Sequence, residues 1–430
     1  MILKFYLYSI FKNLRFADAF LFLYFLHLEF SFTTIGWLLG LQHLVAVILE
    51  LPSGMLADRW GRCRVLSLSF LAYALSFLGY WWIDRTQHTQ LTGYAVCLML
   101  FAVGEAFRSG SHKAIMLSYL QAIGKKELAT QVIGRTRSVS KFTSAVSAIV
   151  AGVIIYLSGN FRLLFLFSFL TSLLGYVLIL SYPNYLERSE KPPKQTGEAS
   201  WDFLSWHQQG SGSRFWALLF QSIVFESQCK MVLKYFLQPF VETGLRTFQI
   251  QLLASAKTTG MSGSGAVWIG VNEFLKDGVG GWGARTSKEF DDQWEDQFKE
   301  LNVLYLVAFL ITMGVALVSL SASWGFIPGI LLLIGLAFLQ NLRRPVFLAA
   351  FDTTIRNEHR ATAMAAERVL RALLIAMLLP VYGVTADQTG LGGVWVLSAI
   401  VFGFGFATSF AIRRVGANAA EAGTMVHSTS

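Results

Sequence analysis

Hydrophobic stretches long enough to cross a bilayer recur along almost the whole of this chain, and they restrict its fold more than any other feature. A membrane-spanning helix needs about 20 mostly apolar residues to cross roughly 30 Å of hydrocarbon. Hydrophobic residues make up 54% of the 430 residues and charged residues only 14%, too few to coat a soluble globule of this size. The sequence therefore predicts an all-α membrane protein.

Twelve spans are predicted, six on either side of a polar segment. The first six cover about 5–28, 32–57, 64–83, 92–120, 131–157 and 160–182, and the second six cover about 213–240, 264–283, 301–320, 324–349, 361–385 and 391–412. The eighth is Gly-rich and polar, so it is either a broken helix that lines a cavity or a segment partly outside the membrane. Residues 243–260, just before it, are interpreted as an extended external loop.

The polar segment divides the chain almost in half. The prediction is an N-terminal six-helix lobe at 1–182, a cytosolic linker at 183–213, a C-terminal six-helix lobe at 214–414 and a disordered cytosolic tail at 415–430. A weak internal repeat supports two pseudo-symmetric lobes. One Arg and two Gly recur at the same intervals in the fifth and eleventh spans, as Arg137, Gly152 and Gly159 and as Arg368, Gly383 and Gly390.

The distribution of basic residues predicts the orientation. The formal charge is +9, but Lys and Arg cluster between hydrophobic spans, which favours anionic lipid over nucleic acid as their partner. The loops after even-numbered spans are the basic ones, so the positive-inside rule places both termini in the cytosol of a multi-pass plasma membrane protein. The three cysteines show neither metal spacing nor a disulfide framework, and neither a metal site nor a cofactor is expected.

A charged stretch, GMLADRWGRCR, lies between the second and third spans at Gly54 to Arg64. Glycine allows close helix approach and a sharp turn, an acidic side chain can face the N-terminus of a neighbouring helix, and the basic side chains are expected to stay in the cytosol. The residues concerned are Gly54, Asp58, Arg59, Gly61, Arg62 and Arg64. They are the candidate cytosolic gating motif.

Charges within the spans are the second group of candidates, because a charge at bilayer depth is expensive and is expected to face protein or water. Glu105, Arg108 and His112 follow one another at helical spacing in the fourth span, where the acid and the Arg can pair. Glu226 and Lys230 repeat this arrangement in the seventh span. Asp18, in the first span close to Arg15, completes the set of candidate cavity or coupling residues.

Two roles stay open for these deep charges: proton coupling or substrate binding on the one hand, and ion pairs that lock helices together on the other. Arg135, Arg137 and Lys141 lie close to the cytosolic end of the fifth span, so gating or lipid contact is favoured for them over substrate binding.

The chain resembles the major facilitator superfamily over nearly its whole length. The resemblance rests on GMLADRWGRCR and on FRSGSHKAIMLSYL, IGRTRSVSKF, KYFLQPF and RRPVFLAAF, which are similar to bacterial drug-efflux-like or uncharacterised facilitators. It implies twelve helices in two six-helix lobes that work by alternating access. By matching positions it also implies that the Gly54 to Arg62 residues form a cytosolic latch, in which Asp58 meets the start of the eleventh span.

The expected function is secondary active transport of an unidentified small molecule, with proton coupling and export, by a monomer surrounded by membrane lipids. One alternative is a non-transporting sensor or scaffold on a transporter fold. The other is a membrane-embedded enzyme that uses His112 or His359 as a base. The sequence has no His-Glu-x-x-His, Gly-x-Ser-x-Gly or Gly-x-x-x-x-Gly-Lys pattern, which argues against an enzyme or an ATP-driven pump.

Overall fold

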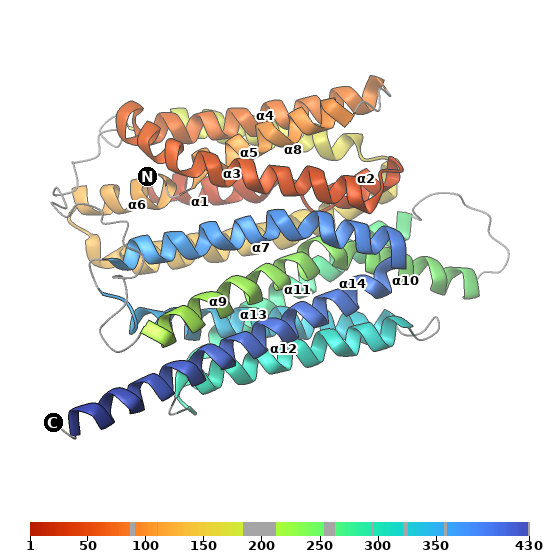
Figure 1. The fold of residues 1–430 in the computed structure, drawn as a ribbon. Coiled ribbons are helices and arrows are strands. Elements are labelled where there is room, and N and C mark those ends of the chain that lie inside the picture. Colours follow the sequence, from red (N-terminus) through yellow and green to blue (C-terminus); the bar gives the residue numbers. More distant parts are fainter. Residues whose placement is uncertain are drawn as a thin grey trace. The chain divides into compact units, whose positions relative to one another are not determined.

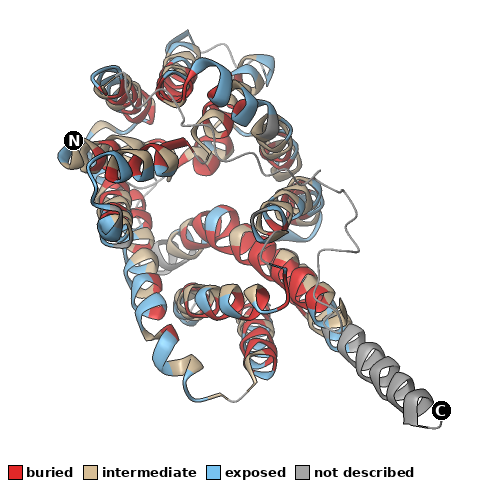
Figure 2. Ribbon diagram, turned by 90° about the vertical axis from the view of Figure 1, so that its left-hand side faces the viewer, coloured by how far each residue is buried: buried red, intermediate tan, exposed pale blue. Residues whose placement is uncertain are grey.

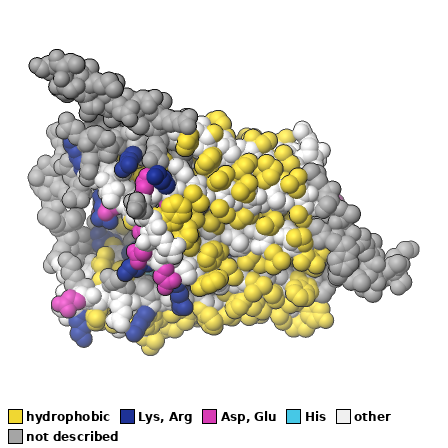
Figure 3. All heavy atoms as spheres, turned by 90° about the horizontal axis from the view of Figure 1, so that it is seen from below, with side chains coloured by type: hydrophobic (Ala, Val, Ile, Leu, Met, Phe, Trp, Pro, Cys, Tyr) yellow, Lys and Arg dark blue, Asp and Glu magenta, His cyan; other side chains and the backbone are white. Residues whose placement is uncertain are grey.

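The computed structural model is built from helices that run side by side (Figure 1). It describes residues 1–86, 91–109, 111–183, 212–252, 263–294, 296–320, 326–356 and 359–428, and from Ala411 onward only the backbone. Within these residues, eight helices are long and apolar enough to cross a membrane by length and composition. On the face drawn in Figure 3, hydrophobic side chains cover much of the described surface and charged side chains gather towards one end. The all-α membrane fold is therefore confirmed.

Contacts between residues divide the chain into two compact units. The first contains Met1–Thr196 and Leu253–Leu275, and the second contains Gly197–Leu252 and Lys276–Ser430. Most of the predicted linker, 184–211, lies outside the described residues, as do the side chains of the predicted tail. The boundaries of the linker and the tail stay predictions.

The helices of the first unit follow the predicted spans closely, with two breaks. They are α1 (Ile2–Asn13), α2 (Leu21–His27), α3 (Phe32–Trp60), α4 (Arg62–Thr86), α5 (Leu91–Arg108), α6 (Ser111–Ala122), η1 (Lys126–Leu128), α7 (Ala129–Ser158) and α8 (Arg162–Leu180). The first predicted span is divided between α1 and α2, and the fourth between α5 and α6.

The break in the first span has a physical cause in the neighbouring helix α8. Between α1 and α2 the helical hydrogen bonds lapse, and hydroxyl groups of α8 replace two of the lost partners. Ser168 Oγ accepts a hydrogen bond from the Ala17 backbone N–H at 3.1 Å, and Thr171 Oγ1 donates to the Leu14 carbonyl at 2.7 Å. Irregular backbone at membrane depth persists only where protein groups satisfy it in this way.

The second unit holds the remaining helices. They are α9 (Gly212–Lys230), the π-helical segment η4 (Met231–Phe236), α10 (Leu237–Leu252), α11 (Gly263–Asp291), α12 (Gln297–Leu320), α13 (Phe326–Asp352) and α14 (Arg360–Ser428). The first half of α11, up to Leu275, belongs to the first unit. The prediction that 243–260 forms an extended loop is wrong for its first part, because α10 continues to Leu252, supported by a Glu242–Arg246 pair at 2.6 Å.

The eighth span, for which two interpretations stayed open, is a continuous helix of 29 residues. Its glycines explain why it is so poor in large apolar side chains. A Cβ atom added to Gly270 would lie 2.6 Å from the Ala148 carbonyl oxygen of α7, and one added to Gly152 would lie 2.5 Å from the Ala266 carbonyl oxygen. The Gly residues are needed so that the backbones of α7 and α11 can approach closely.

The second glycine of the repeat has a positive φ in both the fifth and the eleventh span. Gly159 ends α7 with φ 70°, and Gly390 interrupts α14 with φ 71° at the boundary between the predicted eleventh and twelfth spans. Only glycine adopts a positive φ at little cost, although ψ differs, 4° at Gly159 and −174° at Gly390. This pair of the sequence repeat therefore marks a helix end in the first half and a helix interruption in the second.

Each unit buries its own core on the sides where its helices meet (Figure 2). In the first unit aromatic rings of α2, α4, α5 and α8 pack together, with Tyr24 4.8 Å and Tyr80 5.0 Å from Phe165 between ring centroids. In the second unit a cluster around Phe215, Phe347 and Phe351 joins α9, α12 and α13. These cores hold the helices that carry the deep charges.

Candidate functional site

The predicted gating motif lies at the junction of α3 and α4. Gly61 makes the turn with φ 102°, a conformation that suits glycine, and α4 begins at Arg62 directly after it. Asp58, Arg59, Arg64 and Gly54 are exposed, and a Cβ atom added at Gly54 would meet nothing within 4 Å. Within the described part of the first unit, no helix packs closely against Gly54; the close approach expected at this glycine and the latch role of the motif both stay predictions.

The charges of the first and fourth spans come together in one cluster, which we call the N-terminal cluster: Arg15, Asp18, Tyr73, Glu105 and Arg108. Glu105 is its centre, because Arg15 lies 2.8 Å from Oε1 and Arg108 lies 2.5 Å from Oε2. The Tyr73 hydroxyl donates to Glu105 Oε1 at 2.8 Å and accepts from Arg108 Nε at 3.0 Å. The pair predicted from the spacing of Glu105 and Arg108 is confirmed.

Arg15 also connects this cluster to Asp18 and to two aromatic rings. Its guanidinium lies 3.3 Å from the Asp18 carboxylate, and it lies over the rings of Tyr73 and Phe101 at 5.0 and 5.1 Å. Every charge of the cluster thus has an oppositely charged partner on α5 or in the turn after α1.

His112 is not part of the ion-pair cluster. It is buried at the start of α6, where its ring stacks on Tyr8 of α1 at 3.5 Å with an angle of 9° between the planes. Phe5 packs edge-on against the same ring at 5.6 Å. Its surroundings are those of an aromatic side chain that joins α1 to α6.

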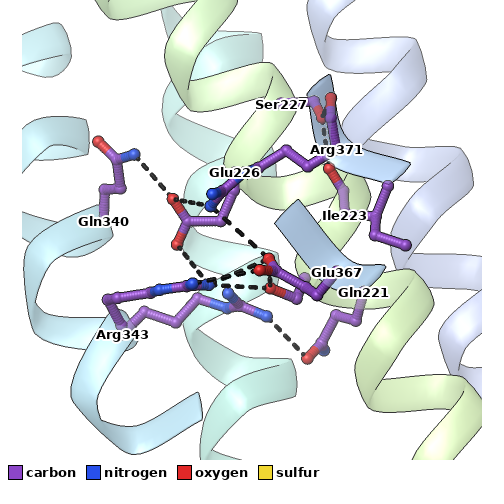
Figure 4. A network of polar contacts seen from close by, with 10 residues as sticks. Gln221, Ile223, Glu226, Ser227, Gln340, Arg343, Glu367 and Arg371 are labelled. Atoms are coloured by element: carbon purple, nitrogen blue, oxygen red, sulfur yellow. Dashed lines mark hydrogen bonds and ion pairs between the residues drawn. The ribbon is translucent and has the colours of Figure 1, made fainter. Parts of the chain in front are cut away.

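A second cluster lies in the other unit and is shown in Figure 4. We call the following residues the C-terminal cluster: Ser222, Glu226, Gln340, Arg344, Glu367 and Arg371. Arg344 lies 3.2 Å from Glu367 and 3.8 Å from Glu226. Arg371 lies 3.6 Å from Glu367 and 4.0 Å from Glu226. Two guanidinium groups are therefore shared between two carboxylates of α9 and α14.

The two carboxylates of this cluster are held differently. Glu367, 1% exposed, accepts hydrogen bonds from Arg344 at 3.2 and 3.3 Å and from Ser222 at 2.9 Å. Glu226 accepts one hydrogen bond from the neutral amide of Gln340 at 3.0 Å. Its Oε1 atom is buried and has no hydrogen-bond partner in the part of the chain that the structure describes.

Arg343 precedes Arg344 but points to a different environment (Figure 4). It is fully buried, lies over the Phe225 ring at 4.3 Å and donates to Gln221 at 3.1 Å. Gln221 in turn donates to Asn302 of α12 at 2.8 Å. Among the described residues no carboxylate forms an ion pair with Arg343.

Lys230, the remaining candidate, ends α9 at the start of the π-helical segment η4. Such segments leave backbone carbonyls without their usual partner. Here Lys276 of α11 donates to the Leu233 carbonyl at 3.2 Å, so that a cation from the polar eighth span stabilises the irregular backbone of the seventh.

Sequence reasoning missed Glu367, Arg371 and Arg344. A signal for the first two was present, because an acid and an Arg four residues apart within a span are expected to pair on one helix face. Arg344 was noticed only as part of the RRPVFLAAF block. That these side chains meet Glu226 depends on the packing of three helices, which no local spacing reveals.

Comparison with known proteins identifies the family to which this chain belongs. The family model for the Major Facilitator Superfamily matches residues 13–375. The chain therefore belongs to that superfamily of membrane transporters, and its fold is twelve helices in two six-helix lobes. No curated protein matches the chain.

Solved structures of transporters share the fold at low sequence identity. A mutant form of the nucleoside transporter NupG is 16% identical, with a TM-score of 0.73 over 96% of this chain and 99% of that one. A mutant of the peptide transporter POT is 12% identical, with a TM-score of 0.68 over 96% and 95% of the two chains. A bacterial homologue of the iron transporter ferroportin is 11% identical, with a TM-score of 0.66 over 94% and 97%.

Proposed function

We propose that this membrane transporter is a proton-coupled secondary transporter that moves a small molecule by alternating access. The main support is the pair of charged clusters on the spans of both units. Charges in membrane spans are expensive, and they commonly serve ion or substrate pathways. The proposal includes a monomer in the plasma membrane with both termini in the cytosol, and the resemblance to efflux facilitators favours export.

Glu226 is the carboxylate that we assign to proton coupling. Glu105 and Glu367 each accept hydrogen bonds from guanidinium groups at 3.3 Å or less. Among the residues that the structure describes, Glu226 has guanidinium groups only at 3.8 and 4.0 Å, and its one hydrogen bond comes from a neutral amide. Of the three, Glu226 gives up the least ion-pair stabilisation when it takes up a proton.

Proton uptake at Glu226 would also release the two arginines that it shares with Glu367. Because α9, α13 and α14 each contribute to these contacts, a change of charge at one carboxylate alters the attraction between three helices. This is the kind of two-state contact that can couple ion binding to a change of conformation.

The test is proton flux in proteoliposomes that contain the purified protein, with a panel of amphipathic cations, sugars and organic anions added on either side. We expect flux that depends on one substrate class, and its loss in Glu226→Gln. Glu242→Gln is the matched control, because Glu242 pairs with Arg246 on α10 outside both clusters.

Three outcomes of this experiment contradict parts of the proposal. Substrate movement without proton flux would exclude proton coupling. Movement of the substrate in the same direction as the protons would exclude proton-driven export. No movement of any compound by a folded protein would favour the alternative of a sensor on a transporter fold.

A further inference from the structure

A shallow groove lies between α1 and α7 in the first unit. Its volume is about 530 Å³, within the range of roughly 300–1,000 Å³ typical of ligand sites. Five of the seven residues that line it are apolar and two carry a hydroxyl group: Ile10, Leu14, Ser138, Val139, Phe142, Thr143 and Val146. Of these, Phe142 is 69% exposed.

The groove belongs to a longer apolar stripe along α7. The stripe repeats at intervals of three and four residues, which keeps side chains on one helix face. Beyond the groove it continues through Val150, Val153 and Leu157, which are 39%, 38% and 76% exposed. A row of exposed Val and Leu along a membrane helix is typical of a surface that faces lipid tails.

Towards the start of α7 the stripe reaches a cation. Arg135 lies four residues before Val139 and is exposed, so it stands on the same face, towards the start of α7. Arg137, two residues before Val139, stands on the other side of the helix. The axial distance from Arg135 to Val146 is about 16 Å. This length matches half of a hydrocarbon core of roughly 30 Å.

We infer that the α1/α7 groove binds an anionic phospholipid of the leaflet at the start of α7, with one acyl chain in the groove and the phosphate at Arg135. The apolar lining suits a hydrocarbon chain, and the guanidinium group suits a phosphate. The length of the stripe suits a single leaflet. By the distribution of basic residues this is the cytosolic leaflet, where anionic lipids are enriched.

The test is native mass spectrometry of the full chain in detergent, titrated with dioleoyl phosphatidylglycerol or dioleoyl phosphatidylcholine. We expect the first phosphatidylglycerol to bind several-fold more tightly than the first phosphatidylcholine. Arg135→Gln is expected to weaken phosphatidylglycerol binding by about fivefold, the effect of one cation near a lipid surface, and to leave phosphatidylcholine unchanged.

Two further variants separate the groove from its surroundings. Val139→Trp fills the groove and is expected to weaken binding of both lipids, whereas Val153→Trp, on the same stripe beyond the groove, is expected to change neither. Arg137→Gln is the matched control for charge, and it is expected to bind phosphatidylglycerol as the wild type does.

Equal losses in the Arg135 and Arg137 variants would show a diffuse attraction to basic residues and would overturn the assignment. So would equal binding of the two lipids by the wild type. If Val139→Trp stops transport but leaves lipid binding intact, the groove belongs to the transported substrate. These lipid measurements do not depend on proton flux, so the inference and the proposed function fail separately.

Discussion

The two charged clusters differ in how tightly their carboxylates are held. In the N-terminal cluster one carboxylate, Glu105, binds two guanidinium groups at 2.8 and 2.5 Å. In the C-terminal cluster two carboxylates share two guanidinium groups at 3.2 to 4.0 Å. The first arrangement is expected to fasten α1 to α5, whereas the second can exchange partners at little cost. Similar residue types can thus serve stability in one lobe and coupling in the other.

The largest expected effect is on stability, at Glu105. Glu105→Gln leaves Arg15 and Arg108 without their shared carboxylate, and breaking a buried ion pair on one side costs about 3–5 kcal/mol. The partial exposure of these side chains, 12% to 27%, places the expected loss towards the lower end. Thermal unfolding can be followed by labelling of the three cysteines, all buried in the folded chain. An unfolding temperature of Glu105→Gln equal to that of the wild type would show that the N-terminal cluster does not stabilise the fold more than the C-terminal cluster does.

Glu226→Gln sharpens the comparison from the other side. An amide keeps the shape of the side chain and the contact with Gln340, so the stability loss is expected to stay below about 1 kcal/mol. Proton flux is expected to be lost or uncoupled from the substrate. A stability loss as large as that of Glu105→Gln would mean that both clusters serve to stabilise the packing of the helices.

Gln221→Leu tests whether the buried Arg343 stabilises the fold of the C-terminal lobe or takes part in proton coupling. The substitution removes the acceptor of the one hydrogen bond that Arg343 makes among the described residues and leaves this fully buried guanidinium group only its contacts with the rings of Phe225 and Phe347 there. The expected cost is about 1–3 kcal/mol of stability with little change in the proton dependence of transport. A shift in proton coupling would instead make Arg343 a member of the C-terminal cluster.

Asp58→Asn is expected to have the smallest effect on stability. Asp58 is exposed near the end of α3, and it belongs to neither cluster. It is expected to slow transport while the unfolding temperature stays that of the wild type. Wild-type transport rates in this variant would contradict the assignment of Gly54 to Arg64 as a latch.

The sequence predicted the fold well because its signals are local. Hydrophobic runs mark the spans, Gly61 marks the turn between α3 and α4, and Gly159 and Gly390 mark helix ends. The breaks were missed for the opposite reason. The interruption between α1 and α2 is stabilised by Ser168 and Thr171, which lie more than 150 residues away.

The same distinction explains the site. Glu105 and Arg108 were found because they are neighbours on one helix. The partnership of Glu226 with Arg344 and Arg371 was missed because it joins three helices. Lys230 was chosen by its spacing from Glu226, but the side chains that contact the Glu226 carboxylate at 3.0 to 4.0 Å are those of α13 and α14.

The divided first span has a consequence for biogenesis. Lys12, Arg15 and Asp18 make this segment a poor candidate for independent insertion by the translocon, and α1 and α2 are not among the eight candidate spans. The hydroxyl groups that satisfy its backbone belong to α8, 151 and 157 positions further along the chain. The segment of α1 and α2 is therefore expected to reach its final place in the N-terminal lobe only after α8 has been synthesised.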